Sequence, residues 1–273
     1  MGLGKQIRLN RLFAHPSGRF CSVAVDHFVG YAGKMHPGLA NLPKAIAEVV
    51  AGGPDAVTAQ KGAALSCWGP HAGKVPLILQ AGCFTQDDRI SEIVTDPEEC
   101  VRMGADAIAI AIGVRGSSEG RYIKFLADGV AAAARYDLPV IAHIYPRRFS
   151  SSGVTVLHEP DEIFWATRVG IECGADVVKV PYTGDPTSYG QIVDVCPVPL
   201  VAAGGPKTET LEDALESMAG VVASGARGAT IGRNVWGHGE IGVALAAFKG
   251  VIHDRLCPSD ALARATRDSA VPA

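Results

Sequence analysis

Lys179 is the residue whose type and surroundings point most clearly to chemistry. It lies in the apolar run Val177-Val-Lys-Val180, and the polar stretch ending at Asp185 follows. A lysine is almost never buried without a partner or a purpose, and burial or a nearby cation lowers its pKa towards neutrality. A neutral amine attacks carbonyl carbon to form a Schiff base. The run therefore predicts a covalent lysine. The alternative is a lysine at a strand rim whose ammonium group reaches solvent.

Two glycine-rich turns that carry cations follow later apolar runs. Gly204, Gly205 and Lys207 belong to the first turn, and Gly232 and Arg233 to the second. Glycine lets backbone amides approach phosphate oxygens closely, and an arginine can hold a phosphate through two hydrogen bonds. The two turns together predict a phosphate site, although ordinary glycine turns would explain either one alone.

Tyr145, Asp26, His27 and His143 also lie at or near the ends of apolar runs. A phenol can carry a proton, and a carboxylate can orient a lysine or accept a proton. The alternatives are an aromatic plug for Tyr145, a loop cap for Asp26, and packed hydrogen-bonding residues for the two histidines. No His-x-x-x-His pair or carboxylate cluster indicates a metal, so we expect neither a metal nor a cofactor.

Eight short apolar runs must position these groups, and helix-like segments separate them. The runs are apolar throughout, which is typical of parallel strands covered on both faces. They predict a single (β/α)8 TIM barrel, whose catalytic groups lie at the carboxyl ends of the strands. A doubly wound open sheet is the alternative, but it would carry a glycine-rich phosphate turn after its first strand. The runs are Phe20–Asp26, Asp55–Gln60, Val75–Gln80, Ala105–Ile112, Leu138–His143, Ala175–Lys179, Val198–Ala203 and Gly228–Gly232.

Helix signals repeat between the runs. Gly104, Gly174 and Gly225 each stand just before a run, where a glycine suits the left-handed position after a helix. Helical patterning covers residues 120–136, 160–173 and 208–224. The chain of 273 residues suits one barrel domain spanning 1–273. Within it, we expect residues 1–18 to form a surface arm or a cap on the barrel bottom, and the tail 255–273 to fray.

Bulk composition excludes several classes of function. Hydrophobic residues make up 48% of the chain and the formal net charge is −3, so no basic surface for nucleic acid or an anionic membrane is indicated. No apolar run reaches the roughly 18 residues of a membrane span, and the first residues lack a signal-peptide core. The seven cysteines form no Cys-x-x-Cys pair, which disfavours a disulfide framework. We expect a cytoplasmic protein.

Taken together, these residues resemble the archaeal-type class I fructose-bisphosphate aldolase family. That family also includes the 2-amino-3,7-dideoxy-threo-hept-6-ulosonate synthases and the autoinducer-2 processing thiolase/aldolase. The resemblance implies that Lys179 forms the Schiff base, Tyr145 donates and accepts a proton, Asp26 assists, and the glycine turns hold one substrate phosphate. It also implies a homo-oligomer. The matching segments are Gly4–Phe13, Val25–His27, Tyr145–Arg147, Lys179–Asp185, Gly204–Lys207 and Gly228–Asn234.

The chain departs from the family pattern at Phe28, His143 and Arg148, where glycine, a large residue such as tryptophan, and glycine are usual. Arg148, Lys34 and His36 could recognise a second anionic group at the far end of the substrate. Three hypotheses follow. The first is reversible aldol cleavage of a phosphorylated ketose, either a bisphosphate, a 1-phosphate or a sulfonated sugar phosphate. The second is transfer of the lysine-bound fragment to another acceptor, and the third is a non-catalytic barrel that binds a sugar phosphate.

Overall fold

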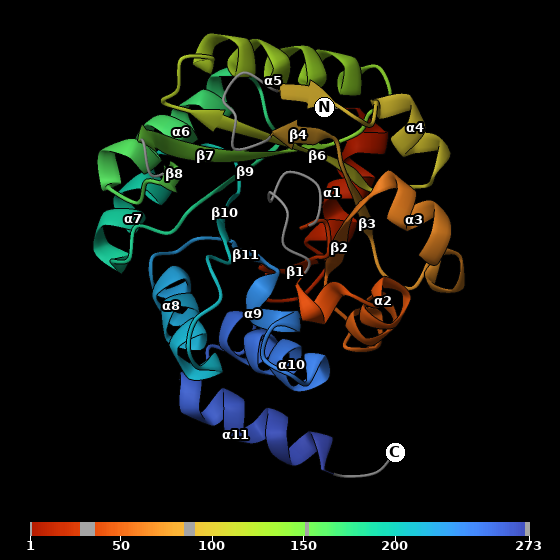
Figure 1. The fold of residues 1–273 in the computed structure, drawn as a ribbon, viewed down its shortest axis with the longest axis vertical. Helices are drawn as coiled ribbons and strands as arrows, with labels where there is room; N and C mark the ends of the chain where they lie inside the picture. The colour runs from red at the N-terminus through yellow and green to blue at the C-terminus, as the bar shows by residue number, and fades with distance from the viewer. Residues whose placement is uncertain (1, 28–35, 85–90, 151–152, 271–273) are drawn as a thin grey trace.

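Eight parallel strands close into a barrel with helices around it (Figure 1). The computed structural model describes residues 2–27, 36–84, 91–150 and 153–270. Around the barrel the strands run β1-β2-β3-β6-β7-β9-β10-β11, and β11 pairs again with β1. This closure confirms the predicted TIM barrel. The strands are β1 Phe20–Ala24, β2 Ala56–Gln60, β3 Leu77–Gln80, β6 Ala107–Val114, β7 Val140–Ser150, β9 Val177–Val180, β10 Leu200–Ala203 and β11 Gly228–Ile231.

Each barrel strand is followed by a helix on the outer side. Gly104, Gly174 and Gly225 adopt φ values of 74°, 82° and 87° after α4, α6 and α8, which confirms the left-handed position expected of them. Helix α8 begins at Leu211, three residues later than the patterning suggested, after a capping box of Thr210 and Asp213. The helices are α2 Leu42–Ala51, α3 Lys61–Cys67, α4 Pro97–Arg102, α5 Glu119–Ala134, α6 Pro160–Glu172, α7 Pro186–Asp194, α8 Leu211–Ala223, α9 Arg233–Trp236 and α10 Ile241–Ile252.

The two faces of the barrel strands have different compositions. Residues that point outward, such as Val178 and Val180, join the large core under the helices. Those that point inward alternate with them, because successive side chains of a strand face opposite ways. At the amino ends the inward residues are apolar, as at Val177. Two positions further along the same strand the inward residue is Lys179. The barrel interior therefore changes from apolar to polar along its axis.

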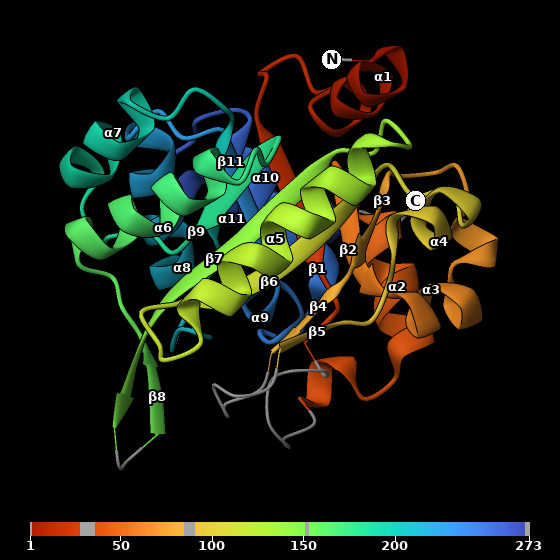
Figure 2. The same cartoon turned by 90° about the horizontal axis from the view of Figure 1, so that it is seen from above.

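Helix α1 (Leu3–Leu12) lies across the amino end of the barrel, opposite the end that carries β8 and α9 (Figure 2). Leu12 is fully buried and packs into the apolar interior beside Phe20. Two ion pairs hold the helix in place: Lys5 lies 3.0 Å from Asp176, and Arg11 lies 3.1 Å from Asp106. Because both carboxylates directly precede barrel strands, α1 is tied to the barrel bottom by charge as well as by burial.

The structure contains short elements that the sequence patterns did not predict. Strand β8 (Gly153–Val156) pairs antiparallel with the end of β7 and forms a hairpin that extends beyond the barrel (Figure 2). Strands β4 (Gly82–Phe84) and β5 (Ser91–Ile93) form a second small sheet. Each is only three or four residues long, so its alternation carries too few positions to be recognised.

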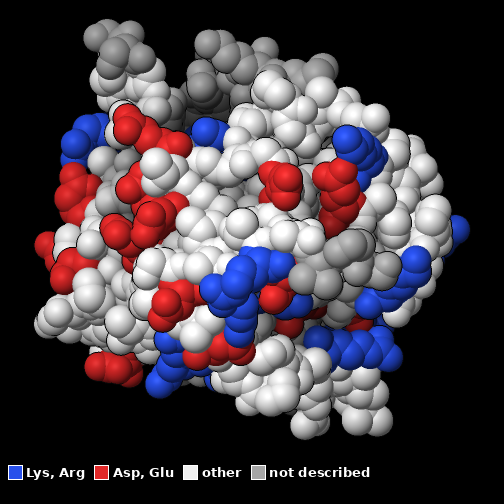
Figure 3. Space-filling view, turned by 90° about the horizontal axis from the view of Figure 1, so that it is seen from below, with Lys and Arg blue, Asp and Glu red and all other residues white. Residues whose placement is uncertain are grey.

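The expectation that the tail frays is wrong for residues 258–269, which form helix α11 (Pro258–Ser269). Ala261 and Ala265 are buried, and α11 packs against α10. Gly250 of α10 permits this close approach, since a Cβ added there would lie 3.2 Å from the Cβ of Ala261. On the face that includes α10 and α11, acidic and basic side chains are interspersed (Figure 3). No helix in the described part of the chain is long and apolar enough to span a bilayer.

Candidate active site

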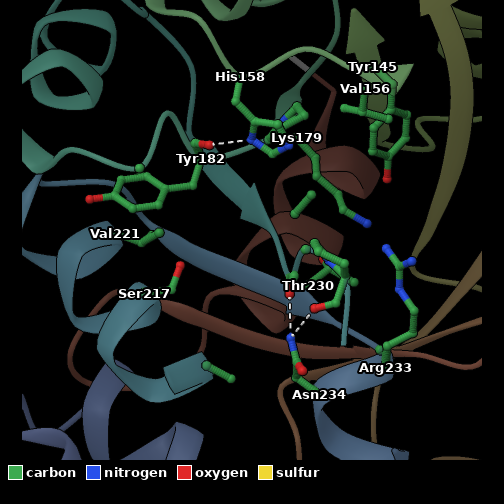
Figure 4. Close-up of a pocket in the computed structure, with 18 of the residues that line it drawn as sticks. Tyr145, Val156, His158, Lys179, Tyr182, Ser217, Val221, Thr230, Arg233 and Asn234 are labelled. Carbon is green, nitrogen blue, oxygen red and sulfur yellow. Dashed lines mark hydrogen bonds between the residues drawn. The ribbon is translucent and has the colours of Figure 1, made fainter. Parts of the chain in front are cut away.

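A cavity of about 780 Å³ opens at the carboxyl end of the barrel. In Figure 4 the Lys179 amine, the Tyr145 hydroxyl and the Arg233 guanidinium point into the same space. Ligand cavities of enzymes typically have volumes in the hundreds of cubic ångströms, so this space suits a small-molecule ligand. Its lining includes His27, Tyr145, Arg147, His158, Lys179, Tyr182, Gly204, Gly205, Gly232 and Arg233.

Lys179 occupies an inward position of β9, directly opposite His143 of β7 and Val201 of β10 in the strand register. Its residue exposure is 5%. Burial lowers the pKa of its amine to about 8 and the charge of Arg233 acts in the same direction, while Asp26 acts against them. With that pKa, roughly a tenth of the amine is neutral and nucleophilic at pH 7.

The glycine turns after β10 and β11 meet beside Lys179. Gly204, Gly205, Gly232 and Arg233 all line the cavity. Gly205 has a φ of +70°, and a Cβ added to Gly232 would lie 2.3 Å from Cε1 of His27. The loops after the last two strands of a TIM barrel frequently form a phosphate site, and these two turns occupy that place.

Asn234 ties these two turns together, and the sequence reasoning did not single it out as a site residue. It is 2% exposed. Its Nδ2 donates to the carbonyl oxygens of Gly204 and Pro206, each at 2.9 Å (Figure 4). Its Oδ1 accepts from the backbone N–H of Thr208 at 3.0 Å. In the sequence, the only indication of this role is that Asn234 is a polar residue directly after Gly232 and Arg233. The role itself depends on hydrogen bonds to the turn after β10, which lies 26 to 30 residues away in the chain.

Asp26 and His27 follow β1 at the same end of the barrel. His27 Nδ1 lies 3.3 Å from one carboxylate oxygen of Asp26, and Gln80 Nε2 donates to the other at 3.0 Å. Burial by itself raises the pKa of Asp26, but the neighbouring His27, Lys179 and Gln80 outweigh burial and hold that pKa well below its usual range. Asp26 is therefore a carboxylate close enough to Lys179 to act on its charge. His27 lines the cavity, whereas Asp26 is not part of the lining.

His143 is 3% exposed and lies beside Lys179 without lining the cavity. Burial lowers the pKa of His143 well below its usual value, and the charge of Lys179 lowers it further. The imidazole is therefore neutral and cannot bind a phosphate by charge. Gln80, at the end of β3, contacts both His143 and Asp26 and was missed by the sequence reasoning. In the sequence, the only indication of a role for Gln80 is that it is a polar residue at the end of an apolar run.

The two adjacent arginines of β7 point to different sides. Arg147 is 2% exposed and lines the cavity, with its guanidinium 5.2 Å from the ring centre of Tyr122. The side chain of Arg148 is 65% exposed and lies 3.5 Å from Glu159, outside the cavity lining. Because side chains alternate along a strand, the cavity receives Arg147 and not Arg148, the residue that the sequence reasoning selected.

Four further residues that the sequence singled out lie away from the cavity or cannot be placed. Lys207 is exposed and does not line the cavity. His36 packs against the ring of Trp236 at 4.5 Å between ring centres. Lys34 and Phe28 lie outside the described residues. Within the described chain, no group of three or more His, Cys, Asp or Glu side chains is arranged to hold a metal ion.

The (β/α)8 barrel has a buried amine, glycine-rich turns and an arginine around its carboxyl-end cavity, which is compatible with a class I lyase, and the comparisons agree. Residues 20–238 match the model of the DeoC/LacD family of aldolases. The chain belongs to this family and is a class I aldolase.

Several relatives are similar over most of the chain. A 2-amino-3,7-dideoxy-D-threo-hept-6-ulosonate synthase of Halobacterium salinarum is 34% identical over 96% of each chain. A class 1 fructose-bisphosphate aldolase of Thermoproteus tenax is 37% identical over 61% of this chain and 64% of its own. The crystal structure of an archaeal fructose 1,6-bisphosphate aldolase matches with a TM-score of 0.80 and 32% identity, covering 92% of this chain and 99% of that one.

Proposed function

We propose that the protein catalyses reversible aldol cleavage of a phosphorylated ketose through a Schiff base on Lys179. The observation that carries this proposal is the position of the Lys179 amine, which opens on the same cavity as Gly204, Gly205, Gly232 and Arg233. A phosphate held in that cradle would bring a nearby carbonyl carbon to the amine. Such remote binding supplies orientation to the reacting atoms.

The neutral Lys179 amine attacks the ketose carbonyl, and the resulting carbinolamine loses water to give an iminium ion. Tyr145 donates its phenol proton to the departing hydroxyl of the carbinolamine and becomes a phenolate. The phenolate then accepts the proton of the substrate hydroxyl, the carbon–carbon bond breaks, and its electrons move to the iminium to form an enamine. The aldehyde leaves. Tyr145 then returns the proton to the enamine carbon, and water hydrolyses the iminium to release the phosphorylated ketone. Covalent catalysis of this kind divides one difficult step into easier ones.

Asp26 supports this sequence as a fixed negative charge. Each of its carboxylate oxygens already has a neighbour, His27 on one side and Gln80 on the other. Its charge favours the cationic forms of Lys179, and the iminium ion is one such form. We therefore assign Asp26 to stabilisation of the iminium and the main proton transfers to Tyr145, which faces the cavity.

Trapping with borohydride tests the proposal. Reduction in the presence of dihydroxyacetone phosphate is expected to add the mass of the reduced ketone to the peptide that contains Lys179. Lys207→Met is the matched control, because Lys207 is an exposed lysine near the cavity that does not line it, and this variant should still be labelled. Absence of an adduct on Lys179 in the unaltered protein would contradict the proposal.

A second candidate is transfer of the lysine-bound fragment to a different acceptor. The relative that is similar over 96% of this chain is a heptulosonate synthase, whereas the 37% identical aldolase matches over only 61%. Product analysis separates the two candidates. A cleaved ketose phosphate that yields free aldehyde and dihydroxyacetone phosphate supports the lyase. Turnover that requires a second carbonyl acceptor supports the transferase.

A further inference from the structure

A buried polar network lies beside the reactive lysine and is separate from the cavity lining. Its members are Asp26, Gln80 and His143, from the ends of β1, β3 and β7. Gln80 is 4% exposed and His143 is 3% exposed. Buried polar groups are costly unless they are hydrogen-bonded, so the orientation of each group is tightly constrained by its neighbours.

The backbone determines which way the Gln80 amide faces. Gly82 donates its N–H to Gln80 Oε1 at 3.1 Å. Since a backbone N–H can only donate, the atom that receives it must be the amide oxygen. The NH2 group of Gln80 therefore faces the other way, towards Asp26 Oδ2 at 3.0 Å and His143 Nδ1 at 3.3 Å.

This orientation also determines the tautomer of His143. Because Gln80 Nε2 can only donate, Nδ1 of His143 must accept, and the proton of the neutral ring resides on Nε2. The charged and titratable groups around this imidazole are Asp26 and His27 after β1 and Lys179 on β9. The backbone N–H of Gly82 thus fixes the orientation of the Gln80 amide. Through that amide it determines the orientation of the Asp26 carboxylate and the ring nitrogen of His143 that carries the proton.

We propose that Gln80 and His143 are positioning residues of the aldolase reaction: Gln80 holds Asp26 facing Lys179 and keeps His143 as the Nε2–H tautomer. The inference rests on the proposed function, since Lys179 must be the reacting amine for the positioning to matter. Neither residue touches the cavity, so both act through Asp26 and Lys179. Because Asp26 stays ionised and His143 stays neutral, the protonation state of Lys179 is the one that governs turnover.

Nitrogen NMR of the wild-type protein labelled in histidine tests the tautomer directly. His143 is expected to show the Nε2–H pattern, unchanged between pH 6 and 9, and His143→Gln identifies its resonance by loss. An Nδ1–H pattern, or titration within that range, would overturn the proposal. This measurement does not depend on any variant of Gln80 folding.

Kinetics test the consequence. Gln80→Leu is expected to lower kcat by about tenfold to a hundredfold with little change in KM, because small misplacements of reacting groups have effects of that size. Gln60→Leu is the matched control: Gln60 ends β2 in register with Gln80, and this variant should keep the wild-type kcat. His143→Gln, which can still accept from Gln80 and donate, should retain more activity than His143→Leu.

Equal losses in Gln60→Leu and Gln80→Leu, or an unchanged kcat in Gln80→Leu, would overturn the positioning role. Borohydride labelling of the wild-type protein distinguishes this failure from failure of the proposed function. If Lys179 is labelled and Gln80→Leu behaves as wild type, only the positioning role is wrong. If Lys179 is not labelled, the Schiff-base proposal itself is wrong.

Discussion

The two ends of the barrel use ionisable side chains in opposite ways. At the amino end, Lys5 and Arg11 of α1 are ion-paired with Asp176 and Asp106, and Leu12 fills the barrel beneath them. At the carboxyl end, Lys179 is buried yet forms no ion pair within the described residues, and it faces a cavity. Paired charges hold a helix in place, whereas an unpaired buried amine has a lowered pKa and is reactive. The amino end thus uses its charges for stability, whereas the carboxyl end holds the residues of the proposed reaction.

Lys179→Met should give the largest effect on activity. We expect kcat/KM to fall by about a thousandfold or more, as for loss of other covalent nucleophiles. The melting temperature should stay the same or rise, because methionine removes the cost of burying a charge. Steady-state kinetics and thermal denaturation measure the two quantities. A large drop in melting temperature would mean that Lys179 has a structural role and would break the contrast between the ends.

Leu12→Ala tests the opposite end. Removing a fully buried leucine from the barrel bottom should lower the free energy of unfolding by about 2–5 kcal/mol, through lost burial and the cavity left behind. Chemical denaturation measures this change. The kcat of the folded variant should equal that of the wild type, because the change lies at the other end of the barrel. Leu3→Ala is a control on the same helix, since Leu3 is 72% exposed and should matter little.

Arg147→Gln and Arg148→Gln form a matched pair within the carboxyl end. If Arg147 binds a second anionic group, Arg147→Gln should lower kcat/KM for a ketose bisphosphate by about tenfold to a hundredfold, the usual range for a hydrogen bond to a charged group. The effect on a ketose 1-phosphate with a neutral tail should be smaller. Arg148→Gln should leave both substrates unaffected, because Arg148 points away from the cavity. Equal effects of the two variants would contradict this assignment.

The pH dependence of kcat/KM should report the amine of Lys179. Because only the neutral amine attacks a carbonyl, activity should rise with pH through a pKa of about 8. Asp26 raises the pKa of Lys179, so Asp26→Asn should move this rise to lower pH even though the maximum rate falls. A profile that is flat between pH 6 and 9 would contradict the link between Lys179 and turnover.

The smallest effect is expected on stability at the amino end. Burial lowers the pKa of His15, and the neighbouring His253, whose ring stacks on it at 3.7 Å, lowers it further. The unfolded chain therefore binds a proton at this position more readily than the folded chain does. Stability should fall as pH drops below about 6.5, the ordinary histidine pKa. Denaturation of His15→Asn across this pH range should show a weaker dependence of stability on pH than the wild type. An unchanged dependence would contradict the assignment of this effect to His15.

Much of the architecture could be predicted, because repeated local signals were enough. All eight barrel strands fall on apolar runs, and the glycines before three of them adopt the left-handed conformation. Strand β8 escaped prediction since its four residues are partly exposed and pair with an unusual extension of β7. Helix α11 escaped because a polar, alanine-rich segment is buried through its contacts with α10 and α8.

For the site, the sequence by itself determined the residue types: a lysine within an apolar run and glycine turns with an arginine, in an order that places them at the ends of strands. The tertiary structure decided which of them share one space. Arg147 rather than Arg148 reaches the cavity, Lys207 stays outside it, and Gln80 joins Asp26 to His143 across three strands. The physical reason is that side-chain direction, burial and hydrogen-bond partners depend on neighbouring strands far away in the chain. These contacts set the pKa of Lys179 and the proton position on His143.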